Sequence, residues 1–177
     1  MNQCATSPPP RVMNAMTVDV EDYFQVSAFE PHFSRDAWDR IECRVERNTN
    51  LILDLFDEHE AKGTFFTLGW VAERYPALVR EICSRGHEIA SHGMAHIRAT
   101  EQSRQAFRED VGQSKKLLED TSGAVVKGYR AASFSIASSN LWTLDEIDAA
   151  GYAYSSSIYP VRHDLYGIPS APRYPFR

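Results

Sequence analysis

The sequence lacks most of the features of a disulfide-stabilised, membrane-spanning or nucleic-acid-binding protein. It contains only three cysteines, Cys4, Cys43 and Cys83, and no CxxC pair. This argues against a disulfide framework and a thiolate zinc site, and favours free thiols in a reducing compartment. No apolar run approaches the roughly 20 residues of a membrane helix. The formal net charge of −5 argues against binding nucleic acid through a basic face.

The N-terminal residues lack the apolar core of a signal peptide, so we expect a cytoplasmic protein. Prolines at positions 8 to 10 indicate a disordered lead over residues 1–11. Residues 12–177 are expected to form one domain. The 43% hydrophobic and 24% charged content of the whole chain is typical of a globular protein.

Short apolar runs alternate with segments of helical periodicity. Strands are expected at residues 12–20, 63–70, 87–92, 125–130 and 152–159. Helices are expected at about 44–60, over an apolar face from Leu78 to Cys83, at about 103–120, and from Ser139 or Asn140 to Ala150. This alternation predicts parallel βα units, an α/β fold in which functional groups gather at the C-terminal ends of the strands.

Polar residues do follow the expected strands. Asp19, Glu21 and Asp22 follow the first expected strand, Thr67 the second, His92 and His96 the third, and Arg130 the fourth. Ser155 to Ser157 lie near the end of the fifth. Parallel strands bring such ends to one edge of a sheet. The pattern therefore predicts a single polar site.

The segment SHGMAH is the strongest local signal in the sequence. His92 and His96 are four residues apart, so a helix or a tight loop would turn both imidazoles to one side. Neutral imidazoles suit zinc, iron or cobalt, and a catalytic site needs a third ligand and an open position. Two surface histidines at a helix start are the alternative, which the acidic cluster on another strand argues against.

The segment TVDVEDYF places three carboxylates within four residues at the end of an apolar strand. Such groups repel one another and resist desolvation, which a cation would relieve. The alternative is a solvated acidic loop. Asp19 and Glu21 share one strand face by period two, whereas Asp22 points elsewhere unless the strand has already ended. Arg130 could clamp one carboxylate in a bidentate pair, or could be a surface residue.

Five motifs, DVEDYF, GTFFTLGW, GHEIASHGMAH, GYRAASFSI and YSSSIYP, together resemble the NodB-homology polysaccharide deacetylases of carbohydrate esterase family four. The similarity is greatest to the type found in PEP-CTERM/exosortase exopolysaccharide loci, and it covers residues 12–177. It implies a distorted (β/α) barrel with fewer than eight strands. It also implies a metal-dependent hydrolase that removes N-acetyl groups from an amino-sugar polysaccharide.

The resemblance assigns roles to particular residues. Asp19 would be the general base, oriented by Arg130, while His92 and His96 would hold a divalent metal, zinc before iron or cobalt. The family pattern favours Asp22 as the third ligand, and the shared strand face favours Glu21. An oxyanion would rest on the metal and on backbone N–H groups near Ser133 and Phe134. The expected substrate contacts are Tyr23, Trp70, Ser133 and Phe134, and the aromatics Tyr23, Phe24, Trp70, Phe134 and Tyr159 would line a sugar groove or belong to the barrel core.

The sequence departs from the family pattern at two positions. Ala132 stands where proline is usual, and Ser155 stands where aspartate is frequent. Family members continue past residue 177, so we expect a C-terminally truncated chain whose general acid lies beyond it. His163 and His87 are poor substitutes for that acid.

Three other functions fit part of the pattern. They are an inactive carbohydrate- or metal-binding fragment, an allantoinase-like cyclic-amide hydrolase, and a TIM-like metallophosphoesterase. The last is disfavoured because the predicted site offers chiefly Arg130 for a phosphate. An unclosed barrel would leave a strand edge unpaired, which predicts poor solubility or dimerisation.

Overall fold

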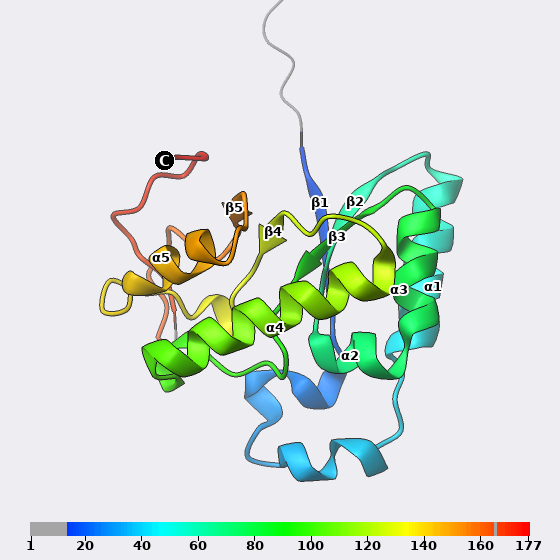
Figure 1. Ribbon diagram of the computed structural model, residues 1–177, viewed down its shortest axis with the longest axis horizontal. Coiled ribbons are helices and arrows are strands. Elements are labelled where there is room, and N and C mark those ends of the chain that lie inside the picture. The colour runs from blue at the N-terminus through cyan, green and yellow to red at the C-terminus, as the bar shows by residue number, and fades with distance from the viewer. Residues whose placement is uncertain (1–13, 165) are drawn as a thin grey trace, which may run out of the picture.

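The sheet is parallel and follows the order of the chain. The computed structural model describes residues 14–164 and 166–177, so the predicted lead over residues 1–11 lies outside the described residues. Its strands are β1 (Met16–Val20), β2 (Gly63–Thr67), β3 (Glu88–Ser91), β4 (Gly128–Tyr129) and β5 (Tyr154–Ser155), paired in the order β1-β2-β3-β4-β5. β1 and β5 are the edges, so within the described residues the sheet is open (Figure 1). The predicted α/β architecture is confirmed.

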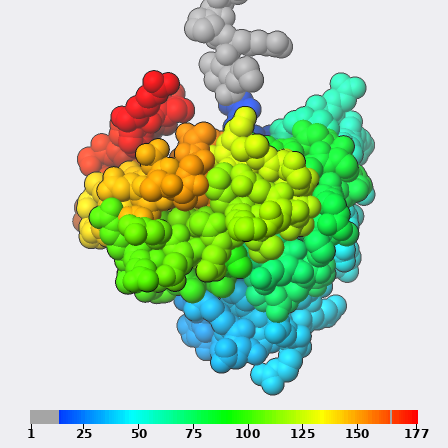
Figure 2. All heavy atoms as spheres, viewed as in Figure 1, coloured from blue at the N-terminus to red at the C-terminus, as the bar shows by residue number. Residues whose placement is uncertain are grey.

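Helices connect and cover these strands. They are α1 (Val45–Glu58), α2 (Gly69–Arg74), α3 (Pro76–Ser84), α4 (Arg104–Ser122) and α5 (Trp142–Ala149). Both α3 and α4 pack on β3 and against each other, and α4 crosses the front of the view in Figure 1. Short 3-10 helices are η1 (Tyr23–Gln25), η2 (Ser27–Phe29), η3 (Arg35–Arg40), η4 (Ala99–Glu101) and η5 (Ala132–Phe134). Figure 2 shows the segment of residues 21–44 as a blue lobe below the rest of the molecule.

The long helices follow from apolar spacing and local capping. In α1 the buried positions are Val45, Thr49, Leu53 and Phe56, one face of the helix. In α4 the Ser103 hydroxyl accepts a hydrogen bond from the Ala106 N–H (3.2 Å), and Gly123 ends the helix at φ 71°. The predicted ranges of 44–60 and 103–120 agree with these helices to within two residues.

Several predicted boundaries were wrong. The strand predicted for residues 63–70 stops at Thr67, because the chain turns into α2 at Gly69. The strands predicted for 125–130 and 152–159 pair over only two residues each. Asn140 does not cap α5: its side chain bonds the Ala137 N–H and the Ser135 carbonyl instead, and the helix begins at Trp142.

Two further properties follow from the described residues. Cys43 and Cys83 are unpaired, as expected. Among the described helices, none is both long enough and apolar enough to cross a membrane.

Candidate metal centre

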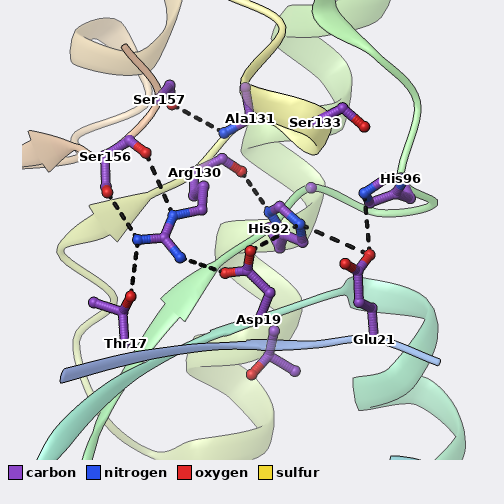
Figure 3. A network of polar contacts seen from close by, with 12 residues as sticks. Thr17, Asp19, Glu21, His92, His96, Arg130, Ala131, Ser133, Ser156 and Ser157 are labelled. Carbon is purple, nitrogen blue, oxygen red and sulfur yellow. Dashed lines mark hydrogen bonds and ion pairs between the residues drawn. The ribbon is translucent and has the colours of Figure 1, made fainter. Parts of the chain in front are cut away.

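Three side chains from two strand ends converge at the C-terminal edge of the sheet. Glu21 follows β1, and His92 and His96 follow β3, with one ligand atom of each within 4.8 Å of the others. Glu21 Oε2 lies 3.0 Å from His96 Nε2 and 3.9 Å from His92 Nε2. Figure 3 shows all three pointing toward one another. One carboxylate and two imidazoles form a donor set suited to zinc or a similar ion.

The ring of His92 is oriented by the backbone. Its Nδ1 lies 2.8 Å from the Arg130 carbonyl oxygen, which fixes Nδ1 as the protonated nitrogen and leaves Nε2 as the lone-pair atom toward Glu21. A histidine that ligates a metal is commonly held in this way through its other nitrogen. The sequence could not show this contact because it joins residues 38 positions apart.

The electrostatics of the cluster match those of a cation site. Burial lowers the pKa of His92, and burial together with His92 lowers the pKa of His96 to about 3, so both are neutral near pH 7. Burial, reinforced by Asp19, raises the pKa of Glu21 to about 8. Within the described part of the chain, neither Glu21 Oε2 nor His96 Nδ1 has a hydrogen-bond partner. A buried carboxylate oxygen without a hydrogen-bond donor is stabilised by a bound cation.

Asp22 does not join this cluster. Its carboxylate accepts hydrogen bonds from the N–H groups of Tyr23 (2.9 Å), Arg44 and Val45 (2.8 Å). The side chain is only 3% exposed. It caps η1 and accepts the N–H groups at the start of α1, where a negative charge is favoured. The geometry therefore supports Glu21 as the carboxylate ligand, the choice that the shared strand face favoured.

The loop between the two histidines is held from two sides. The N–H groups of Gly69 and Trp70 donate to the carbonyls of Gly93 and Met94 (both 2.8 Å). On the other side, Asp110 Oδ1 accepts the Met94 N–H at 3.1 Å. His96 itself adopts a left-handed φ of 50°, which is uncommon for a non-glycine residue. The loop is thus constrained on both sides of Met94 before His96 is reached.

Asp110 was not predicted as a residue of this site. Burial raises the pKa of its carboxyl to about 6, although the Met94 N–H opposes this. A signal was present in the sequence, because Asp110 lies on α4 beside the buried residues Phe107, Val111 and Ser114, where a carboxylate is rare.

Asp19 lies beside the cluster and is clamped by Arg130. Arg130 Nη1 donates to Asp19 Oδ1 at 2.5 Å, and Asp19 Oδ2 lies 4.0 Å from His92 Nε2. Arg130 is fixed in turn, since it donates to Ser156 Oγ (2.9 Å), the Ser156 carbonyl (3.3 Å) and Thr17 Oγ1 (3.1 Å). Figure 3 shows this chain of contacts across the sheet. One carboxylate oxygen is held while the other faces the proposed ligands.

The aromatic residues expected at a sugar groove separate into two groups. Tyr23, Phe24 and Trp70 pack with Trp38 and Phe33, and Arg74 lies 3.9 Å from the centre of the Trp70 ring. Phe24 is fully buried and Trp70 is 9% exposed, and both belong to the core cluster, against which the partly buried Tyr23 packs. Phe134 and Tyr159 instead contact each other and Tyr166.

Ser133 follows Arg130 by three residues and occupies η5 with a left-handed φ of 51°. Its hydroxyl lies 2.7 Å from the Ser27 hydroxyl. The Phe134 N–H donates to the Ala131 carbonyl at 3.1 Å. The Phe134 N–H is thus already bonded within the chain.

His87 is a structural residue. Its Nδ1 accepts the Gly63 N–H (3.2 Å) and its ring packs on Phe56 and Phe65, which agrees with the expected strand-start position.

The comparisons with known proteins all point in one direction. The family model for polysaccharide deacetylase matches residues 36–154. A peptidoglycan-N-acetylglucosamine deacetylase of Bacillus cereus is 37% identical over 71 residues, which are 40% of this chain and 33% of that protein. A chitooligosaccharide deacetylase of Rhizobium leguminosarum bv. trifolii is 33% identical over 70 residues, again 40% of this chain and 33% of that protein.

Among solved structures, a candidate polysaccharide deacetylase from Mycobacterium smegmatis superimposes with a TM-score of 0.68 at 28% identity, covering 81% of this chain and 50% of that one. The chain thus spans about a third of the length of these curated relatives and half of that structure.

Proposed function

Since this chain belongs to the polysaccharide deacetylase family, we propose that it is a metal-dependent enzyme that hydrolyses the acetamide of an N-acetylated amino-sugar polysaccharide, releasing acetate and a free amine. The observation that carries this proposal is the cluster of Glu21, His92 and His96 with the Arg130-clamped Asp19 beside it. The resemblance of the first motif to exopolysaccharide-locus deacetylases supports an exopolysaccharide as the substrate.

The donor set fits a divalent cation. In its ionised form Glu21 brings one negative charge while the two histidines are neutral, so a dication would coordinate the Glu21 oxygen and offset the cost of burying that charge. Zinc, iron and cobalt all accept such ligands. When bound, the ion would supply a Lewis acid for the acetamide carbonyl and for the attacking water.

The residues of the chain would carry the proton transfer and the orientation. Asp19 takes the proton of the water that attacks the acetamide carbon, through the oxygen that faces the cluster. Arg130 holds the other oxygen, so the base does not rotate away. The Ser133 N–H donates to the developing oxyanion. The C–N bond then breaks, and the leaving amine takes a proton from a general acid.

The test is acetate release from chitooligosaccharides and from peptidoglycan by the zinc-loaded protein, with allantoin as a cyclic-amide control. We expect acetate from at least one glycan, no turnover of allantoin, and loss of activity in Asp19→Asn. Glu109→Gln, an exposed change on α4, is the matched control. A folded protein that holds its metal and releases no acetate would overturn the proposal in favour of metal or carbohydrate binding without turnover.

A further inference from the structure

The lobe formed by residues 21–44 (Figure 2) reaches the loop that carries the two histidines. Its helix η3 begins with Arg35. Arg35 Nε donates to the Ala95 carbonyl at 3.2 Å, and Arg35 Nη2 donates to the His96 carbonyl at 3.3 Å. These carbonyls belong to the two peptide bonds that flank the Cα atom of His96. One guanidinium group therefore holds the backbone on both sides of a candidate metal ligand.

The backbone of His96 needs such a hold. Its φ is 50°, a left-handed value that is uncommon for a residue other than glycine and that persists only where the surroundings enforce it. The Ala95 carbonyl precedes the φ rotation of His96 and the His96 carbonyl follows its ψ rotation. A single group bound to both carbonyls thus restrains both rotations, which together set the direction of the Cα–Cβ bond.

That direction decides where the imidazole lies. The side chain of His96 is buried, with Nε2 3.0 Å from Glu21 Oε2, and Figure 3 shows the ring pointing at this carboxylate. A backbone rotation at His96 would swing the ring away from both Glu21 and His92. The contacts of α2 and Asp110 described above act on Gly93 and Met94, whereas Arg35 acts on the next two residues.

Arg35 is itself held in place. Glu30 Oε1 accepts a hydrogen bond from Arg35 Nη2 at 2.9 Å, and Glu30 Oε2 lies 3.4 Å from Arg98 Nη2. The same helix η3 carries Trp38, which is 2% exposed and packs edge-on against Trp70 with 5.7 Å between ring centres. The helix is thus anchored in the core, and its first residue is delivered to the loop from a fixed position.

We propose that Arg35 is a positioning residue of the metal centre, which holds His96 in the left-handed conformation that aims its imidazole at Glu21 and His92. Arg35 acts through the backbone and is not one of the three proposed ligands. The planar fork of an arginine reaches two carbonyls and a carboxylate at once, whereas a lysine carries the same charge on a single nitrogen. The role of His96 as a ligand rests on the proposed function, but the hold on its backbone does not require a metal.

The first test is zinc affinity against a competing chelator, together with the visible spectrum of the cobalt-loaded protein. Arg35→Ala should weaken zinc binding about three- to tenfold and shift the cobalt bands, because the imidazole is no longer aimed. Arg35→Lys should recover only part of the affinity. Arg40→Ala, an exposed position of the same helix, is the matched control and should behave as the wild type does.

The second test is hydrogen exchange of the backbone amides of residues 94–98 in the metal-free protein. Arg35→Ala should accelerate this exchange about three- to tenfold while the amides of α3 exchange as in the wild type. If the wild type binds no zinc and the exchange still accelerates, the hold on His96 stands and the metal centre of the proposed function fails.

Three results would overturn the inference and leave the proposed function intact. The first is a folded Arg35→Ala protein with the zinc affinity and the cobalt spectrum of the wild type. The second is an Arg35→Lys protein equal to the wild type, which would assign the effect to charge rather than to the two-point hold. The third is exchange accelerated equally in α3, which would mean a general loss of stability.

Discussion

Glu21 and Glu146 are both largely buried carboxylates, but their surroundings are opposite. Glu146, in α5, is 2% exposed. Its carboxylate accepts hydrogen bonds from Arg104 Nε at 2.5 Å and Arg108 Nε at 2.6 Å, and both arginines belong to α4. The hydrogen bonds of Arg108 and then Arg104 lower its pKa to about 2. Glu21 has neutral histidines and Asp19 as neighbours, and burial raises its pKa to about 8.

The comparison separates a structural carboxylate from a ligand. Glu146 obtains its counter-charge from the chain and thereby links two helices. Glu21 obtains none from the described residues, so its charge is stabilised only when a cation arrives. A protein that keeps such a group accepts a cost in stability for binding. The substitutions below test that difference.

Asp19→Asn should have the largest effect, on turnover alone. The amide cannot take the proton of water, so acetate release should fall about 10²- to 10⁴-fold. Asp19 is not one of the three proposed ligands, so metal content by elemental analysis should be unchanged. Loss of the metal together with activity would contradict the separation between base and ligand.

Asp110→Ala should reach the metal site indirectly. Removing the acceptor of the Met94 N–H frees the loop before His96, and zinc affinity should fall about 10- to 100-fold, as for other outer contacts of metal sites. Asp110→Asn keeps an acceptor oxygen and should restore most of the affinity. The readouts are zinc titration against a competing chelator and the visible spectrum of the cobalt-loaded protein. Equal affinity in a folded Asp110→Ala protein would mean that the loop is held well enough without it.

The two glutamates should give opposite dependence of stability on pH in the metal-free protein. The pKa of Glu21 is higher in the folded than in the unfolded state, so the free energy of unfolding falls as pH rises from 4.5 to about 8. Glu21→Gln should remove this decline and stabilise the metal-free protein at pH 8 by about 1–2 kcal/mol.

Glu146 has the opposite sign. Its contribution is complete above pH 4.5 and is lost as pH falls toward 2. Glu146→Gln should lower the melting temperature at pH 7 by roughly 3–8 °C. Thermal unfolding at pH 7 checks the Glu146 variant, and denaturant unfolding at pH 5 and pH 8 checks the Glu21 variant. A Glu21→Gln protein less stable than the wild type at pH 8 would contradict the account.

Ser156→Ala should have the smallest effect. Arg130 loses one of its hydrogen bonds but keeps Asp19, Thr17 and the Ser156 carbonyl. We expect a two- to fivefold fall in kcat, in line with loss of roughly 0.5–1 kcal/mol for one hydrogen bond. Neither KM nor metal content should change. A fall as large as that of Asp19→Asn would show that Arg130 depends chiefly on Ser156.

Much of the site could be predicted from the sequence because its residues lie at strand ends. His92, His96, Glu21, Asp19 and Arg130 are placed by the parallel sheet, and the period of two on β1 favoured Glu21. The family pattern instead favoured Asp22, whose three backbone partners include Arg44 and Val45. These contacts span more than 20 residues, so no local pattern reveals them. The same is true of Ser156 beside Arg130 and of Tyr166 beside Phe134.

The helices were easier to predict than the strands. Local signals in the sequence mark the helices: the apolar face of α1, and the N-terminal cap and C-terminal glycine of α4. By contrast, β4 and β5 pair over only two residues each. Their length is set by what lies beside them in the sheet rather than by their own composition. The division of the aromatics also depends on packing: Trp70 and Phe134 are equally plausible sugar contacts by residue type, and only their neighbours separate core from surface.

The most direct test of the account is the metal content of the purified protein. Elemental analysis of the wild type should find about one zinc, iron or cobalt ion per chain, and the His92→Ala/His96→Ala double variant should have lost it while remaining folded. A folded wild type without metal, or a double variant that retains it, would contradict the assignment of Glu21, His92 and His96 as the metal centre.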